Sequence, residues 1–183
     1  MPRFVALLRG INVGTAKRIA MADLRALLES MGHTQVQTVL NSGNAIFTSS
    51  TRASPAKLAQ TIHAAIAENL GVDTFVIVKT APEVAAVVAG NLWATHDLNP
   101  SQLLVTLTQD LGVLSTITEL GTKPWGAEKL HVGPHAAYLW CAEGILQSKA
   151  ATALLKGLAD AGTTRNWATV EKIHKQLQLP PKS

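Results

Sequence analysis

The stretch VQTVLNSGNAIFTSS, residues 36–50, contains the clearest structural signal in the chain. Two runs of strand-forming residues, Val36–Leu40 and Ala45–Ser49, flank the tetrapeptide Asn41-Ser42-Gly43-Asn44. Asn and Gly tolerate the positive φ angles that tight hairpin turns require. The stretch therefore predicts a β-hairpin, and the elements around it decide which fold contains that hairpin.

The elements on either side of the hairpin alternate in a regular order. Before it, the apolar run Phe4–Leu8 predicts a strand, and apolar residues at helical spacing predict a helix over Ala20–Met31. After it, Ser54-Pro55 supplies an N-cap and a first-turn proline for a helix that ends at Gly71, and Thr74–Val78 predicts another strand. The order βαββαβ is typical of the split-βαβ, ferredoxin-like α/β plait, so the fold class is α+β.

The rest of the chain nearly repeats this order of elements without repeating the sequence. The predicted elements are a helix Ala81–Gly90, a strand Gln102–Thr108, a weak helix Leu111–Leu120, a hairpin of Glu128–Val132 with Ala136–Cys141, and a helix Ser148–Ala159. Where a fourth strand would close this second plait, TTRNWATVEKIHKQL predicts a helix instead. We therefore expect two subdomains, residues 1–90 and 101–183, joined by a connection at 91–100, with the second plait incomplete or decorated with a C-terminal helix.

Composition narrows the class of protein. The chain has 183 residues, of which 47% are hydrophobic and 15% charged, so it can bury a core and is not a disordered protein. Its apolar runs are far shorter than the roughly 20 residues that cross a bilayer, and its N-terminus reads as a first strand and not as a signal peptide. The single cysteine, Cys141, permits no intramolecular disulfide and favours the reducing cytoplasm.

Charge gives a weaker indication of partners. The formal net charge is +4 and the isoelectric point is about 9.4. This balance favours anionic partners, but it is too small to establish nucleic-acid binding. No membrane partner is expected, and the sequence does not predict an oligomeric state.

The loop in LLRGINVGTAKRIAMADL, residues 7–24, raises the question of a phosphate site. Its spacing is neither G-x-x-x-x-G-K-[ST] nor G-x-G-x-x-G, so it is not a nucleotide-binding motif. What remains is a glycine-rich backbone with Arg9, Asn12, Lys17 and Arg18 before a predicted helix, whose N-terminus attracts anions. The alternative is a structural β-to-α connection with solvated basic residues.

Further candidate chemistry is sparse. Ser42 lies in no G-x-S-x-G elbow, so a turn residue is favoured over a nucleophile. His131 and His135 have no further ligands at metal-binding spacing, and Cys141 beside Tyr138 reads as a small apolar residue. No metal or cofactor is expected, and without a catalytic motif the question of enzymatic activity stays open.

A second polar patch lies near the C-terminus. Lys149 stands at the start of one predicted helix, and Arg165 and Asn166 stand at the start of the last. Both helix starts can receive an anion, and an arginine can bind it bidentately. The alternative is that Asn166 caps its helix and Arg165 pairs with a carboxylate or a carbonyl.

Several of these residues together resemble a known family, domain of unknown function 1697, which consists of small bacterial proteins. The shared features are the RGINVG segment Arg9–Gly14, Met21, Leu24, Ser42-Gly43-Asn44, Ser148-Lys149 and the TRNW segment Thr164–Trp167 with Thr169-Val170. The resemblance implies an α/β plait in two subdomains and no established activity. The chain departs from the family pattern at Gly14–Arg18 in place of G-G-K-N-K, at Ala20 in place of proline, and at Asn91-Leu92-Trp93 in place of N-P-F.

The favoured hypothesis is that the separated polar segments converge and bind a small anionic or phosphorylated ligand. Its residues are Arg9, Asn12, Lys17, Arg18, Ser42, Asn44, Lys149, Arg165 and Asn166. A second hypothesis is a nucleic-acid-binding module, although the predicted hairpin offers no stacking aromatic residue except Phe47. A third is an enzyme that uses Ser42 or a histidine, and a fourth is a structural or interaction protein without a small-molecule site.

Overall fold

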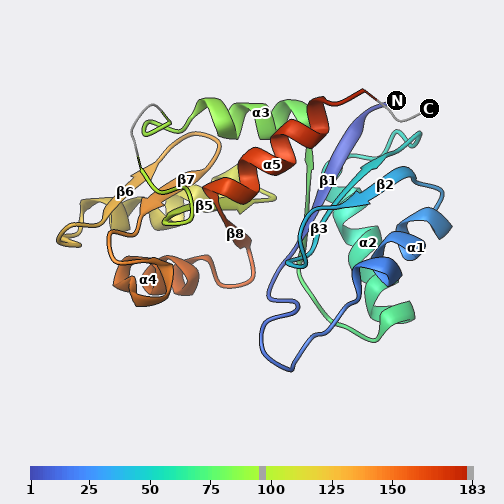
Figure 1. Cartoon of the computed structure of the whole chain (residues 1–183), viewed down its shortest axis with the longest axis horizontal. Helices are drawn as coiled ribbons and strands as arrows, with labels where there is room; N and C mark the ends of the chain where they lie inside the picture. The colour runs from blue at the N-terminus through green and yellow to red at the C-terminus, as the bar shows by residue number, and fades with distance from the viewer. Residues whose placement is uncertain (95–97, 181–183) are drawn as a thin grey trace. The chain divides into compact units, whose positions relative to one another are not determined.

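The computed structural model describes residues 1–94 and 98–180, which form two compact units. The first unit comprises Met1–Pro82 with Lys172–Ser183, and the second comprises Glu83–Glu171. The predicted connection at 91–100 therefore falls inside the second unit, and its residues 95–97 lie outside the described residues. Figure 1 shows the elements of each unit along the chain.

Hydrogen bonds within each unit explain why this division differs from the predicted one. The Tyr138 hydroxyl donates to the Val87 carbonyl at 2.5 Å, which attaches the helix after residue 80 to the second sheet. The Arg3 guanidinium donates to the carbonyls of Gln176 and Leu177 at 3.0 Å each and to that of Leu179 at 2.5 Å. The first strand thereby holds the end of the last helix in the first unit.

The first unit contains one four-stranded antiparallel sheet in the order β2-β3-β1-β4. Its elements are β1 (Arg3–Leu8), α1 (Met21–Ser30), β2 (Thr34–Thr38), β3 (Asn44–Thr48), α2 (Pro55–Leu70) and β4 (Val76–Thr80). The predicted hairpin is confirmed, with Thr38 opposite Ala45. Strand β2 ends two residues earlier than predicted because Leu40 adopts φ +60°, which takes it out of the ladder.

One face of this sheet and the two helices make the core of the first unit. Successive strand residues point to opposite faces, so alternate positions of β1 and β3 share a face. Helices α1 and α2 lie on that face (Figure 1). The buried residues of this core include Phe4, Ala6, Leu8, Ala45, Phe47, Leu24, Leu28, Ile62 and Ile66.

A buried histidine makes the stability of this core depend on pH. His33 is 5% exposed, its ring lies 4.5 Å from that of Phe47, and neither ring nitrogen has a hydrogen-bond partner in the described residues. Burial lowers the pKa of His33 below its usual 6.5, so the unfolded chain binds the proton more tightly than the folded one.

We therefore expect the free energy of unfolding to decrease as the pH falls below about 6.5 and charges this imidazole. In His33→Phe, the free energy of unfolding measured by urea titration should change less between pH 7 and pH 5 than it does in the wild type. His135→Gln, at an exposed position, is the control and should leave the dependence unchanged. If the free energy of unfolding falls equally with pH in the wild type and in His33→Phe, His33 is not the cause of the acid dependence.

The second unit contains another four-stranded antiparallel sheet, in the order β6-β7-β5-β8. Its elements are most of α3 (Ala81–Ala89), β5 (Leu103–Thr108), the 3₁₀ helix η1 (Leu111–Thr122), β6 (Lys129–Val132), β7 (Ala137–Trp140), η2 (Ile145–Gln147), α4 (Lys149–Leu158), β8 (Gly162–Asn166) and the first residues of α5 (Trp167–Gln178). Both units of this α+β chain thus have strands in the same spatial order.

The expectation that a helix replaces the fourth strand of this sheet is wrong. Residues Gly162–Asn166 form β8, which pairs with β5 and places Thr164 opposite Thr106. Consecutive β-branched threonines suit a strand, and Asn166 begins the next helix only after it: its Oδ1 accepts a hydrogen bond from Thr169 N at 2.9 Å. The second sheet is therefore complete, and α5 follows it.

Helix α4 and η1 pack on one face of the second sheet, and Tyr138 points to the other. The predicted weak helix after β5 is a 3₁₀ helix. Its hydroxyls bond to backbone carbonyls, as in Ser115 Oγ to Gly112 O at 2.6 Å and Thr116 Oγ1 to Val113 O at 2.7 Å. Such local bonds compete with α-helical geometry. Across residues 1–94 and 98–180, no helix is both long and apolar enough to span a membrane.

Candidate functional site

The loop between β1 and α1, residues 9–20, has a defined and unusual backbone. Gly10, Asn12, Gly14 and Lys17 adopt φ angles of +64°, +56°, +63° and +51°. Such angles are uncommon for residues other than glycine, so contacts of the loop must hold Asn12 and Lys17 in place. A Cβ at Gly10 or Gly14 would meet nothing within 4 Å, so conformation and not space requires glycine there.

Asn12 supplies those contacts. Its Nδ2 donates to Ile19 O at 2.9 Å and to Asn41 O at 2.8 Å, and its Oδ1 accepts from Ile19 N at 3.0 Å. Its backbone N–H donates to Lys17 O at 3.1 Å. Ile11 and Ile19, next to Asn12 and at the other end of these bonds along the chain, are both buried. One asparagine thus closes the loop and ties it to the hairpin turn.

The hairpin turn is packed against the same loop. Gly43 has φ +82°, and a Cβ there would lie 2.8 Å from both Leu8 Cβ and Ile11 Cδ1. Asn44 is fully buried and its Nδ2 donates to Val39 O at 2.8 Å and to Ser42 Oγ at 2.9 Å. The predicted residues Asn12, Ser42 and Asn44 therefore lie in one connected pair of loops. We call this pair, residues 9–20 and 41–44, the loop platform.

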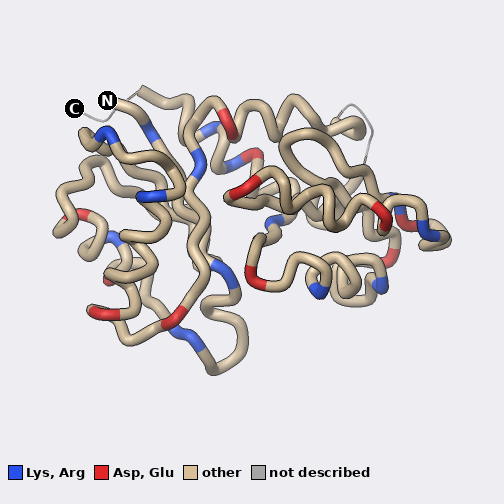
Figure 2. Tube along the Cα trace, turned by 180° about the vertical axis from the view of Figure 1, so that it is seen from behind, with Lys and Arg blue, Asp and Glu red and all other residues tan. Residues whose placement is uncertain are grey.

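Basic side chains lie at the exposed edge of the loop platform. Lys17 and Arg18 are exposed, whereas Arg9 is partly buried. Figure 2 shows Lys and Arg segments along this loop. Helix α1 begins immediately after it, and its N-cap residue, Ala20, makes no side-chain cap. The first N–H groups of α1, which have no partner within the helix, therefore receive no capping bond from the side chain at the N-cap position, and they lie close in sequence to two exposed cations.

The remaining predicted residues, Lys149, Arg165 and Asn166, lie in the second unit. Lys149 is exposed at the start of α4, but Ser148 Oγ and Glu128 Oε2 accept hydrogen bonds from the N–H groups of Ala151 and Ala150, at 2.8 and 3.2 Å. A protein carboxylate thus occupies the place that an anion would take at this helix. The cap was missed because Glu128 is distant in sequence from the helix that it caps.

Arg165 and Asn166 also serve the fold of the second unit. Arg165 is 8% exposed, and its Nη1 donates to Thr163 Oγ1 at 2.9 Å and to Thr164 O at 2.8 Å. Burial lowers the pKa of Arg165 to about 10. The prediction that Asn166 caps its helix is confirmed. That all nine predicted residues share one site stays a prediction.

The remaining candidate chemistry gains no support. Cys141 is fully buried, and burial raises the pKa of its thiol, which keeps it protonated. Phe47 is also fully buried, with its ring 5.6 Å from that of Phe4, so it cannot stack on a base without leaving the core. Within the described part of the chain, no group of three or more His, Cys, Asp or Glu residues could hold a metal ion.

Comparison with known proteins gives a family but no activity. The family described as "Protein of unknown function (DUF1697)" matches residues 1–138. A solved structure of a conserved bacterial protein from Streptococcus pneumoniae is similar, with 26% sequence identity and a TM-score of 0.79 over 97% of this chain and 99% of that one. No curated protein matches the sequence.

Proposed function

The chain belongs to the DUF1697 family of proteins of unknown function, and from the geometry of its loops we propose that the loop platform binds a small anionic or phosphorylated ligand. The observation that carries the proposal is the sequence of features along residues 9–21. A loop whose two ends are joined by Asn12 presents two exposed cations, Lys17 and Arg18, and leads directly into a helix without a side-chain N-cap.

Each part of this arrangement favours negative charge. The N-terminus of α1 carries a partial positive charge and free N–H donors, which together attract phosphate and carboxylate groups. Backbone segments with alternating φ signs can form concave sets of N–H groups that also bind anions. Lys17 and Arg18 add full charges, and an arginine can bind two phosphate oxygens at once. Asp23 in the first turn of α1 opposes this attraction and sets a limit on the affinity.

Removing the two exposed cations tests the proposal. We expect inorganic phosphate or pyrophosphate to raise the melting temperature of the full chain, because a ligand that binds only the folded state stabilises it. In the double variant Lys17→Gln/Arg18→Gln, affinity should fall at least about tenfold, since hydrogen bonds to charged groups contribute roughly 1.5–3 kcal/mol each.

The matched control is Arg52→Gln/Lys57→Gln, which removes two exposed cations from the same unit outside the loop platform. Both double variants lower the net charge by the same amount, so a general charge effect would weaken binding equally in the two. Equal loss in both variants, or a wild-type melting temperature that neither anion changes, would refute the proposal.

We also infer that the first unit is a ferredoxin-like plait. The element order βαββαβ supports this, as does the strand order β2-β3-β1-β4 with every neighbouring pair antiparallel. The second unit has the corresponding strand order, β6-β7-β5-β8, with η1 and α4 in the positions of the two helices. An experimental structure with another strand order would contradict the inference.

A further inference from the structure

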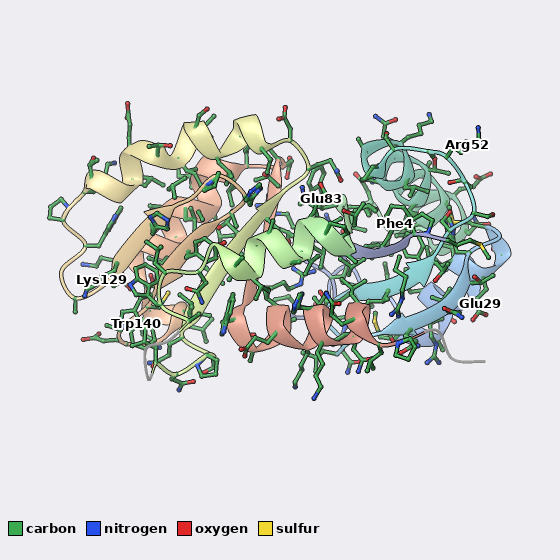
Figure 3. All side chains as sticks on the ribbon, turned by 90° about the horizontal axis from the view of Figure 1, so that it is seen from above. Phe4, Glu29, Arg52, Glu83, Lys129 and Trp140 are labelled. Atoms are coloured by element: carbon green, nitrogen blue, oxygen red, sulfur yellow. The ribbon has the colours of Figure 1, made fainter. Side chains whose placement is uncertain are left out.

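The second unit contains a pocket that the proposed anion site does not use. It has a volume of about 470 Å³ and lies where β6 begins and β7 ends. Figure 3 labels Lys129 and Trp140, which face each other across the ladder at this end of the sheet. Residues 124–128 form one wall, and residues between Ala142 and Lys149 form another. Its volume is within the range of about 300–1,000 Å³ that is usual for small-molecule sites.

Trp125 gives the pocket an apolar surface in a fixed position. Its Nε1–H donates to Leu120 O at 2.6 Å, and part of the ring packs against the core of the second unit. The indole therefore has no donor left for a ligand and offers only its carbon surface. A ligand for this pocket must have an apolar face of its own.

The polar groups of the pocket decide the charge of that ligand. Glu128, Glu143, Gln147 and Lys149 line it. Two carboxylates disfavour an anion, and the ammonium group of Lys149 disfavours a cation. One carboxylate is already engaged, because Glu128 Oε2 accepts the Ala150 N–H at 3.2 Å. The remaining groups accept hydrogen bonds (Glu143), donate them (Lys149) or do both (Gln147).

We propose that this pocket binds a neutral sugar. A pyranose ring has a face of C–H groups for the indole of Trp125 and a rim of hydroxyl groups that both donate and accept. Those hydroxyls match Glu143, Gln147 and Lys149, and an uncharged ligand places no like charge beside either the carboxylates or the ammonium group. The site is independent of the loop platform, because all residues that line it belong to the other unit.

Calorimetric titration of the full chain with neutral sugars tests the proposal. The panel is glucose, galactose, mannose, N-acetylglucosamine and the disaccharides of each, and at least one should bind with a Kd of about 1 mM or tighter. Glu143→Ala and Gln147→Ala change exposed residues, so both variants should fold, and each should weaken binding of that sugar at least about tenfold. Glu119→Ala, an exposed carboxylate outside the pocket, is the matched control and should bind like the wild type.

One variant distinguishes a failure of the sugar proposal from a failure of the anion-site proposal. The Lys17→Gln/Arg18→Gln variant should bind the sugar as the wild type does, whether or not it has lost phosphate binding. The proposal is overturned if no sugar of the panel binds, if Glu143→Ala and Gln147→Ala bind as tightly as Glu119→Ala, or if this pocket instead takes phosphate or tetramethylammonium.

Discussion

Replacing Gly43 by alanine is expected to lower the free energy of unfolding by about 2–4 kcal/mol. Two costs add at this position. The left-handed backbone, φ +82°, costs an L-residue about 1–2 kcal/mol. The new methyl group would lie 2.8 Å from Leu8 Cβ and from Ile11 Cδ1, and such overpacking costs about 1–3 kcal/mol more. A smaller entropy of the unfolded chain offsets less than about 1 kcal/mol of this.

Urea unfolding and thermal melts measure the effect, which corresponds to a fall in melting temperature of about 5–15 °C. Gly14→Ala is the matched control. Gly14 has a similar φ, +63°, but a Cβ there meets no neighbour, so only the conformational cost of about 1 kcal/mol should remain. If the two variants are destabilised equally, the contact between the turn and Ile11 is not what requires glycine at position 43.

Tyr138→Phe is the second substitution with a large expected effect. It removes the donor to the Val87 carbonyl and leaves that buried acceptor unpaired, at a cost of about 1–3 kcal/mol near neutral pH. Burial also raises the pKa of Tyr138 from 10 to about 12. Between these two values the unfolded chain releases the phenolic proton and the folded chain retains it. The wild type should therefore lose stability as the pH rises from about 10 to about 12, by roughly 1.4 kcal/mol per pH unit.

The phenylalanine variant lacks the titrating group, so its stability difference from the wild type should shrink over the same pH range. Urea unfolding at pH 8, pH 10 and pH 11 measures that difference, and the contributions of all groups common to both proteins cancel in it. Tyr138 is the single tyrosine of the chain, so tyrosinate absorbance reports its ionisation directly. Ionisation of the folded protein near pH 10 would disprove the buried position of the hydroxyl.

Elements with strong local signals were predictable. The turn Asn41–Asn44 and the apolar run in β1 led to the first sheet, and Asn166 was correctly expected to cap the last helix. Strand β8 was missed because its residues, GTTRN, lead directly into a helical pattern, and no turn separates them. Pairing with β5, which is distant in sequence, decides the conformation of this segment. The short β2 was misplaced because the left-handed Leu40 ends it, and nothing in the sequence marks a leucine for that conformation.

The candidate sites were predictable only in part. The glycines and Asn12 of the opening loop stood out because such residues favour unusual backbone, and the structure gives Asn12 a role in joining the loop to the turn. The exposed or buried state of each cation was not predictable: Lys17 and Arg18 are exposed, but Arg165 is buried. The pocket of the second unit was not predictable because Trp125 and Gln147, which both line it, are separated in the chain by the β6–β7 hairpin.

The three hydrogen bonds from Arg3 to the end of α5 also bear on the order of folding during synthesis. The first unit is discontinuous in sequence, since its last segment follows the whole of the second unit. Nascent chains fold as segments emerge from the ribosome, with early segments first. Here all residues of the contiguous second unit are synthesised before the carbonyl groups that Arg3 binds. The second unit can therefore complete its fold before the first unit can form these three hydrogen bonds.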